Sequence, residues 1–368
     1  MQGHHFPGRT AIVLGSILML AAPGLRAGFI QTNLASDVMG LAANFDPNLK
    51  NPWGMSFSGS SPLWVSDQAA GVSTLYSGAG VPVSLVVTVP PTTGAPIGPT
   101  GQVFNSTTAF IEGDGTKASF IFDTLAGTID AWNSGNGTTA QVMDTTTGAL
   151  TGLALDPASQ HLYAANFATG AIDVYNSSFS PTTVSGGFVD PNALAGYSPY
   201  NIQLVNGELY VEYDLVNPTT HQPQAGAGLG YVDVFDTNGN FVQRLATGGS
   251  LNAPWGVTQA PAGFGGFGGD ILIGNFGNGE INAFNPVSGA FVGTITDAAG
   301  NPIVNSNLWA IEFPAGGPGV NPNALYFTAG INNQADGLFG SITTPEPGTL
   351  AAGLAALALL LKRRHKLS

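Results

Sequence analysis

Short apolar segments separated by turns rich in Gly, Asn and Asp run through most of the chain. The segments are four to six residues long and rich in aromatic and β-branched side chains, as in 63–76, 120–132, 162–175 and 271–284. Such runs, bounded by turn residues, predict β-strands. Many are apolar throughout, which is typical of strands covered on both faces. Sustained helical periodicity is absent from residues 28–343, so the sequence predicts an all-β domain there.

A short motif centred on a small or turn-forming residue recurs six times. The central residues, which we call the pivots, are Gly54, Gly101, Gly152, Asn201, Gly256 and Ala310. Their mean spacing of about 51 residues is typical of propeller blades with three or four strands. A sandwich or barrel would show no repeat of this length, and a parallel β-helix would repeat at less than half of it. We therefore predict a six-bladed β-propeller, similar to NHL-like and lactonase-like propellers, over residues 28–343.

The two ends of this domain carry a pattern that predicts how the ring closes. The sixth unit has no fourth strand after Ile342, whereas residues 29–34 resemble 291–296, the expected outer strand of the fifth unit. We therefore expect residues 29–34 to supply the outer strand of the last blade, which removes an exposed sheet edge.

The charge of the domain narrows its range of partners. Only 8% of the 368 residues are charged, and residues 28–344 hold three basic residues against 21 acidic ones. A surface this acidic cannot supply the cationic groove that phosphate backbones need, so nucleic acid is excluded as a partner. The absence of cysteine excludes disulfides, thiolate zinc sites and cysteine nucleophiles.

The first 27 residues have the layout of a secretory signal peptide. Arg9 precedes an apolar stretch over residues 11–22, and Ala27 offers a small residue for cleavage before Gly28. We expect export through signal peptidase, the alternative being an uncleaved anchor.

Residues 344–368 form a separate C-terminal segment. Pro345, Glu346 and Pro347 precede an apolar run over 350–361 and a basic cluster over 362–366. The run is short for a bilayer, which needs about 20 residues, so a transient membrane contact is expected. This order of features resembles the PEP-CTERM sorting signal of Gram-negative bacteria. The resemblance implies an exosortase as partner and delivery to the cell surface or extracellular matrix; the alternative is a simple membrane anchor.

Several motifs of the domain point to the same family. The sequences NPWG (51–54), GNFGNGEINAF (274–284) and LYFTAG (325–330) resemble an uncharacterised family of exported bacterial propeller-like proteins that often end in a PEP-CTERM signal. The resemblance implies a propeller fold and export from the cell. It assigns no catalytic residues.

A candidate ligand or metal ring lies at the turns between the second and third strands of successive units. Its members are Asp67, Asp123, Asn166, Asp214 and Asn275. Carboxylate and amide oxygens at the mouth of the channel suit Ca²⁺, which takes six to eight hard ligands. The alternative is structural, because Asp and Asn also stabilise β-turns through bonds to nearby backbone amides.

Two further sets of residues have both a functional and a structural interpretation. Trp53, Trp255 and Trp309 hold matched positions, where they could stack on sugar rings or wedge between blades. His221 and Glu212 are the only pair that a lyase-like propeller could use for acid–base catalysis, although surface exposure explains either residue equally well.

The sequence favours a non-catalytic binding or scaffold propeller, exported to the cell envelope or matrix, with glycans or matrix proteins as partners. The alternative is a Ca²⁺-dependent hydrolase or lactonase with its metal at the channel mouth. Fold alone cannot decide between these functions, because propellers host binding and catalysis alike.

Overall fold

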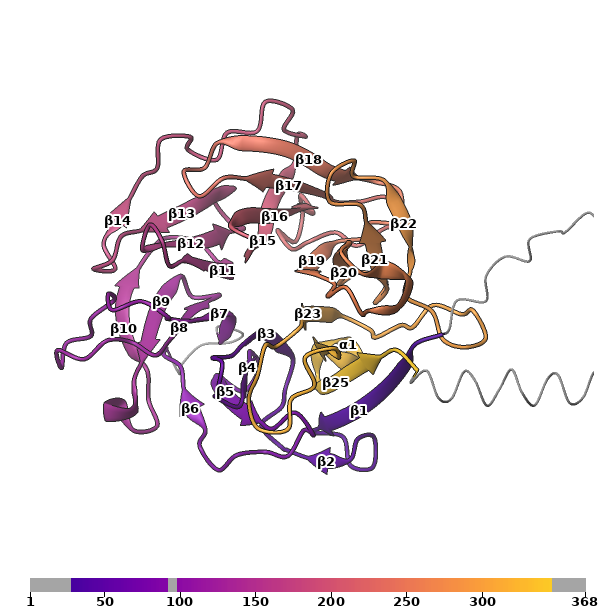
Figure 1. Cartoon of the computed structure of the whole chain (residues 1–368). Coiled ribbons are helices and arrows are strands. Elements are labelled where there is room, and N and C mark those ends of the chain that lie inside the picture. Colours follow the sequence, from indigo (N-terminus) through magenta and orange to yellow (C-terminus); the bar gives the residue numbers. More distant parts are fainter. Residues whose placement is uncertain (1–27, 92–97, 346–368) are drawn as a thin grey trace, which may run out of the picture.

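The protein is a six-bladed β-propeller, as the repeat predicts (Figure 1). A computed structural model describes residues 28–91 and 98–345. Five sheets have four strands and the sixth has five, and the sheets surround a central axis. The short helices are η1 (Ser134–Asn136), η2 (Gly265–Phe267) and α1 (Ile331–Gln334). The all-β prediction is therefore confirmed.

Each blade begins with its innermost strand, and the following strands lie progressively further from the axis. The first blade comprises β3 (Pro52–Ser56), β4 (Leu63–Asp67), β5 (Val72–Tyr76) and β6 (Val87–Thr88). The second comprises β7 (Pro99–Phe104), β8 (Phe120–Thr124), β9 (Thr128–Trp132) and β10 (Gln141–Thr145). The third comprises β11 (Leu150–Asp156), β12 (His161–Asn166), β13 (Ala171–Tyr175) and β14 (Pro181–Thr182).

The other blades follow the same order, except that the last takes its outer strands from the start of the domain. The fourth blade comprises β15 (Tyr197–Val205), β16 (Glu208–Leu215), β17 (Tyr231–Phe235) and β18 (Phe241–Thr247). The fifth comprises β19 (Pro254–Gln259), β20 (Ile271–Asn275), β21 (Ile281–Phe284) and β22 (Phe291–Thr294). The sixth comprises β23 (Leu308–Glu312), β24 (Leu325–Ala329), β25 (Leu338–Thr343), β1 (Ile30–Ser36) and β2 (Asn44–Phe45).

The ring closes through β1, as predicted. This strand pairs antiparallel with β25 from Ile30 opposite Thr343 to Ser36 opposite Leu338. The short strand β2, which the sequence did not predict, pairs parallel with β1. The side-chain amides of Gln31 and Asn305 also bond to each other at 2.9 Å, which links the closing strand to the chain that follows the fifth blade.

The pivots lie where neighbouring innermost strands approach each other most closely. Every innermost strand has a register irregularity at its pivot. A Cβ atom added to Gly54 would lie 2.5 Å from the carbonyl oxygen of Thr100, and one added to Gly101 would lie 2.4 Å from the amide nitrogen of Leu153. Glycine is therefore required at these positions by close backbone contact between blades.

Apolar side chains fill the spaces between blades. Trp64 stacks on Phe120 at 4.0 Å and lies 4.9 Å from Trp132, between the first and second blades. Trp132 ends β9 and is 7% exposed, so it is part of the core between these blades.

Both terminal segments fall largely outside the described residues. The signal-like segment 1–27 is not described, and of the Pro-Glu-Pro motif only Pro345 is. In the part of the chain that the structure covers, no helix has the length and apolar character needed to cross a membrane.

We predict that Gly101→Ala destabilises the propeller by about 1–3 kcal/mol, because the added methyl group overpacks the contact with the third blade. Urea unfolding of the full chain measures this change. The control is Gly59→Ala, since a Cβ at Gly59 meets nothing within 4 Å. Equal stability of the two variants would contradict the role of the pivot.

Candidate functional site

Aromatic side chains from four innermost strands meet on the axis of the propeller. Trp53, Tyr200, Trp255 and Trp309 each immediately precede a pivot, and together we call them the aromatic plug. The rings of Trp53 and Trp309 stack at 3.6 Å between centroids, and Trp255 lies edge-on to them at 6.0 and 5.6 Å. The three tryptophans are at most 5% exposed. They contact one another in the channel and do not wedge between adjacent blades.

Hydrogen bonds across the channel hold the plug in place. The indole nitrogen of Trp255 donates to the carbonyl oxygen of Thr151 at 2.9 Å, and that of Trp309 donates to Asn51 Oδ1 at 3.0 Å. Asn201 Nδ2 donates to the carbonyl oxygen of Trp255 at 2.6 Å. The Trp255 bond joins the fifth blade to the third across the channel, while the other two join neighbouring blades, the sixth to the first and the fourth to the fifth. The plug separates two cavities, one on each side of it.

One cavity lies on the face of the ring that carries the turns between the second and third strands of the blades. We call it the upper vestibule, and its volume is about 580 Å³. Its floor is aromatic, and amide side chains and His221 lie around it. Its lining consists of Trp53, Gln68, Leu125, Ala149, Thr151, Phe167, Ala168, Tyr200, His221, Gln222, Pro223, Phe276 and Gln334.

Two buried donors belong to the lining of the upper vestibule. Gln68 is 3% exposed and Trp53 is 5% exposed. Gln68 Nε2 and Trp53 Nε1 have no hydrogen-bond partner among the residues that the structure describes. A buried donor without an acceptor is costly, so these two groups favour a ligand that carries acceptor oxygens.

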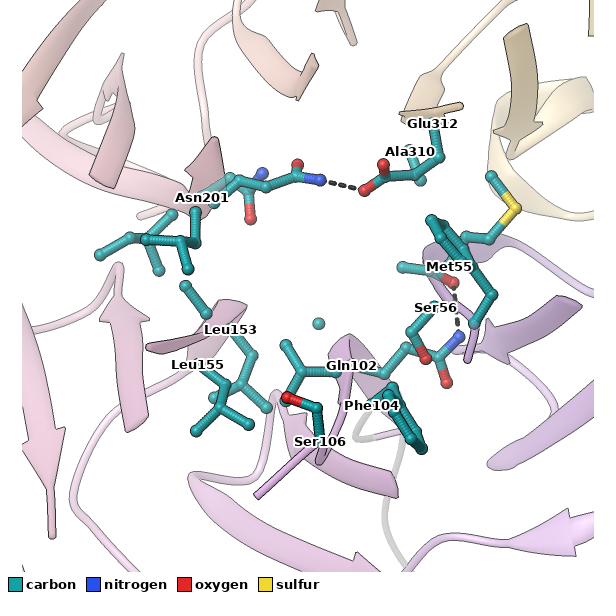
Figure 2. A pocket seen from close by; sticks show the side chains of 18 of the residues that line it. Met55, Ser56, Gln102, Phe104, Ser106, Leu153, Leu155, Asn201, Ala310 and Glu312 are labelled. Atoms are coloured by element: carbon teal, nitrogen blue, oxygen red, sulfur yellow. Dashed lines mark hydrogen bonds between the residues drawn. The ribbon is translucent and has the colours of Figure 1, made fainter. Parts of the chain in front are cut away.

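The cavity on the other side of the plug is the lower vestibule, with a volume of about 340 Å³ (Figure 2). Its polar side chains are those of Ser56, Gln102, Ser106, Asn201, Gln203 and Glu312. Gln203 donates a hydrogen bond to Glu312, which connects the fourth and sixth blades across the channel. Glu312 is the only ionisable residue in the described lining, and burial raises the pKa of its carboxyl to about 8.

The five residues of the predicted ring are all fully buried, and none lines the upper vestibule. Asp67 accepts from Thr74 Oγ1 at 2.6 Å, and Asp123 accepts from the amide of Gly101 at 2.6 Å. Asn166 donates to the carbonyl oxygen of Thr147 at 3.0 Å, and Asn275 to that of Ser250 at 2.8 Å.

Each of these four side chains makes at least one hydrogen bond within the fold, whereas Asp67 Oδ1 and Asp123 Oδ2 have no partner among the described residues. Among the described residues, no three His, Asp or Glu side chains come together as metal ligands. The predicted positions lie on the face of the ring where the upper vestibule opens, but their side chains do not line it. The side chains immediately after the predicted positions, Gln68, Phe167 and Phe276, line the vestibule.

The fifth member, Asp214, and the catalytic candidate Glu212 lie buried on β16. Both side chains are 0% exposed, and their carboxyl oxygens have no hydrogen-bond partner within the described part of the chain. Burial raises the pKa of each carboxyl well above its ordinary value. His221 is exposed and lines the upper vestibule, whereas Glu212 lines neither vestibule. The structure therefore does not form the lyase-like pair.

The lower vestibule was not predicted from the sequence, although three of its polar residues recur at a fixed position. Ser56, Gln203 and Glu312 each stand two residues after a pivot, in strands that are otherwise mostly apolar. A polar residue at the same repeat position in three innermost strands is the signal that could have identified a channel-facing column.

Comparison with known proteins finds relatives in Acanthamoeba polyphaga mimivirus, and no family model matches the chain. The relative named "Uncharacterized protein R648" is 32% identical over 324 residues, covering 84% of this chain and 78% of its own length. A second, "Uncharacterized protein L690", is 29% identical over 328 residues, covering 82% of each. A third, "Uncharacterized protein R640", is 30% identical over 62% of this chain and 43% of its own length.

These relatives correct the resemblance drawn from the motifs. Assignment to a family of exported bacterial proteins with a PEP-CTERM signal is wrong, because the matches along most of the chain are mimivirus proteins. The NPWG motif lies at the innermost strand β3 and the LYFTAG motif in β24. Both motifs therefore belong to the strands that build the propeller.

We predict that the protein becomes more stable as the pH falls from 8 to 5. Burial raises the folded-state pKa of Asp123 to about 6 and that of Asp130 and Glu312 to about 8, above the unfolded values near 4. The folded state therefore binds protons more tightly, and stability is lost as the pH rises through these values. The melting temperature should rise by several degrees on acidification.

The carboxylate of Asp297, whose pKa is lowered by hydrogen bonds from nearby backbone and side-chain groups, is ionised in both states above pH 5, so it adds little to this trend. Glu312→Gln should flatten the pH dependence, whereas Glu208→Gln at the β15–β16 turn should leave it unchanged. A melting temperature that rises from pH 5 to pH 8 would show that the buried carboxyls do not control stability.

Proposed function

The chain belongs to the family of the mimivirus protein "Uncharacterized protein R648", and we propose that within this family it acts as a non-catalytic binding module for a neutral glycan. The proposed binding site is the upper vestibule. The observation that carries the proposal is the pair of buried, unpartnered donors, Gln68 Nε2 and Trp53 Nε1, on side chains that line an aromatic-floored cavity.

The composition of the vestibule supports a neutral ligand. Its described lining contains no carboxylate, lysine or arginine, and His221 is its only histidine. The floor combines Trp53, Tyr200 and Phe276, whose flat apolar faces suit the C–H face of a sugar ring. Hydroxyl oxygens of the sugar can accept hydrogen bonds from the amides of Gln68, Gln222 and Gln334.

The size of the vestibule also suits this class of ligand. Small-molecule sites are mostly apolar cavities of about 300–1,000 Å³ with a few well-placed polar groups. At about 580 Å³, the upper vestibule lies within this range. The rigid plug beneath it supports binding to a preformed surface, which limits the entropy lost on association.

The alternative of a Ca²⁺-dependent hydrolase or lactonase has weaker support. Such an enzyme needs carboxylates that reach the ligand, either to hold the ion or to transfer a proton. The carboxylates of Asp67, Asp123 and Asp214 are buried away from the vestibule lining.

Export of the chain is part of the same proposal. It is supported by Arg9 and the apolar stretch 11–22, and by a domain surface with few charges. Glycans at a cell or particle surface would then be the accessible ligands.

The test is a glycan array with the full chain, followed by calorimetric titration of the best-binding glycan. We predict that Gln68→Ala weakens binding about tenfold, which corresponds to about 1.4 kcal/mol, through loss of one hydrogen-bond donor. The matched control is Gln141→Ala on β10, where the side chain is exposed on the outer strand. Unchanged affinity for Gln68→Ala, or no binding to any neutral glycan, would refute the proposed site.

A further inference from the structure

The carboxyl of Glu312 lacks a cationic partner in a protein with very few cations. Among residues 28–91 and 98–345, the basic side chains are Lys50, Lys117 and Arg244. Lys50 pairs with Asp37 at 2.6 Å, and Arg244 pairs with Asp233 at 2.7 Å. Lys117 donates to the carbonyl oxygen of Thr107 at 3.0 Å.

Each of these basic side chains is therefore engaged elsewhere, and none lines the lower vestibule. The charge of an ionised Glu312 can be balanced only by a cation from solution. An uncompensated carboxylate in a partly enclosed cavity is unfavourable, so such a cation would be strongly preferred.

The lower vestibule contains a second group that points to a ligand. Ser56 is 6% exposed, and its hydroxyl has no hydrogen-bond partner among the described residues. Figure 2 shows Ser56 and Glu312 among the side chains around the cavity, contributed by β3 and β23. Because the sixth blade precedes the first around the ring, these two strands are neighbours at the channel wall.

Aromatic rings complete the lining of the lower vestibule. Trp255 forms part of its inner wall, and Phe57 and Phe104 line it further along the innermost strands. Aromatic faces attract cations through their quadrupole, and an aromatic wall with one carboxylate is the usual composition of a site for an alkylammonium group.

The same groups are poorly suited to a hard metal ion. Calcium takes six to eight oxygen ligands. The described lining offers one carboxylate, and the side-chain oxygen of Gln102 already accepts a hydrogen bond from Ser73 Oγ at 3.2 Å. An organic ammonium ion needs fewer oxygen ligands and gains from the aromatic wall.

We propose that the lower vestibule binds a small organic ammonium ion, with Glu312 as its counter-ion, Trp255 as its aromatic contact and Ser56 as an additional hydrogen-bonding group. This site lies on the opposite side of the aromatic plug from the proposed glycan site. The two proposals can therefore fail independently.

Binding is linked to the protonation of Glu312. Because burial raises the pKa of this carboxyl to about 8, most empty sites hold a proton at pH 6.5. The cation requires the ionised carboxylate, so binding must release that proton. The affinity therefore increases as the pH rises through 8.

The test uses choline as the probe and 3,3-dimethyl-1-butanol as its neutral isostere, with saturation-transfer NMR on the full chain at constant ionic strength. We predict that choline binds and that the alcohol binds at least tenfold more weakly. Glu312→Gln should reduce the affinity for choline at least tenfold, since it removes the charge but keeps an acceptor for Gln203. The affinity for choline should increase between pH 6.5 and 8.5.

The matched control is Glu208→Gln, the same substitution outside the cavity at the β15–β16 turn, which should leave binding unchanged. A normal melting profile for Glu312→Gln confirms that the variant is folded. Equal affinity for choline and the alcohol, no loss in Glu312→Gln, or displacement of choline by micromolar CaCl₂ would overturn the proposal.

Discussion

The close approach of six innermost strands at their pivots determines the rest of this structure. A Cβ at Gly152 would lie 2.0 Å from Asn201 Oδ1, and one at Gly256 would lie 2.5 Å from the carbonyl oxygen of Trp309. At the four glycine pivots the blades pack this tightly because the side chain is absent, and each innermost strand changes register at its pivot. The residue before the pivot is directed to the axis in four blades, which assembles the aromatic plug, while residues after the pivot line the lower vestibule.

The plug gives the two ends of the channel different chemistry. Above it, the described lining is aromatic and amide-rich and contains no carboxylate. Below it, the described lining contains one ionisable group, the carboxyl of Glu312, together with the ring of Trp255. The scarcity of basic residues makes this difference important, since a buried carboxylate such as Asp214 or Glu312 has no nearby lysine or arginine to neutralise it. Protonation or a bound ligand must then balance the charge, which links pH, stability and binding in one molecule.

The sequence predicted the architecture well because the fold repeats a local pattern. The pivot period fixed the number of blades, and the similarity of residues 29–34 to 291–296 identified the closing strand β1. The sites were harder to predict, because they depend on which side chain faces the axis after a change of register. Asp67 and Asn166 are preferred in turns for local reasons, so their spacing suggested a ring that the structure does not form. The contacts of Trp53 with Trp255 and Trp309 join residues more than 200 positions apart, and only the closed ring brings them together.

The central claim is that the innermost strands and the closing strand form a single cooperative unit around the plug. Native-state hydrogen exchange measures this directly, because it reports the free energy of opening at each amide. The account predicts that two sets of amides exchange only through global unfolding, with the same dependence on denaturant. They are the amides of the innermost strands β3, β7, β11, β15, β19 and β23, and those of β1 that pair with β25. Exchange of β1 or of any innermost strand through a low-energy local opening, independent of denaturant, would contradict the account.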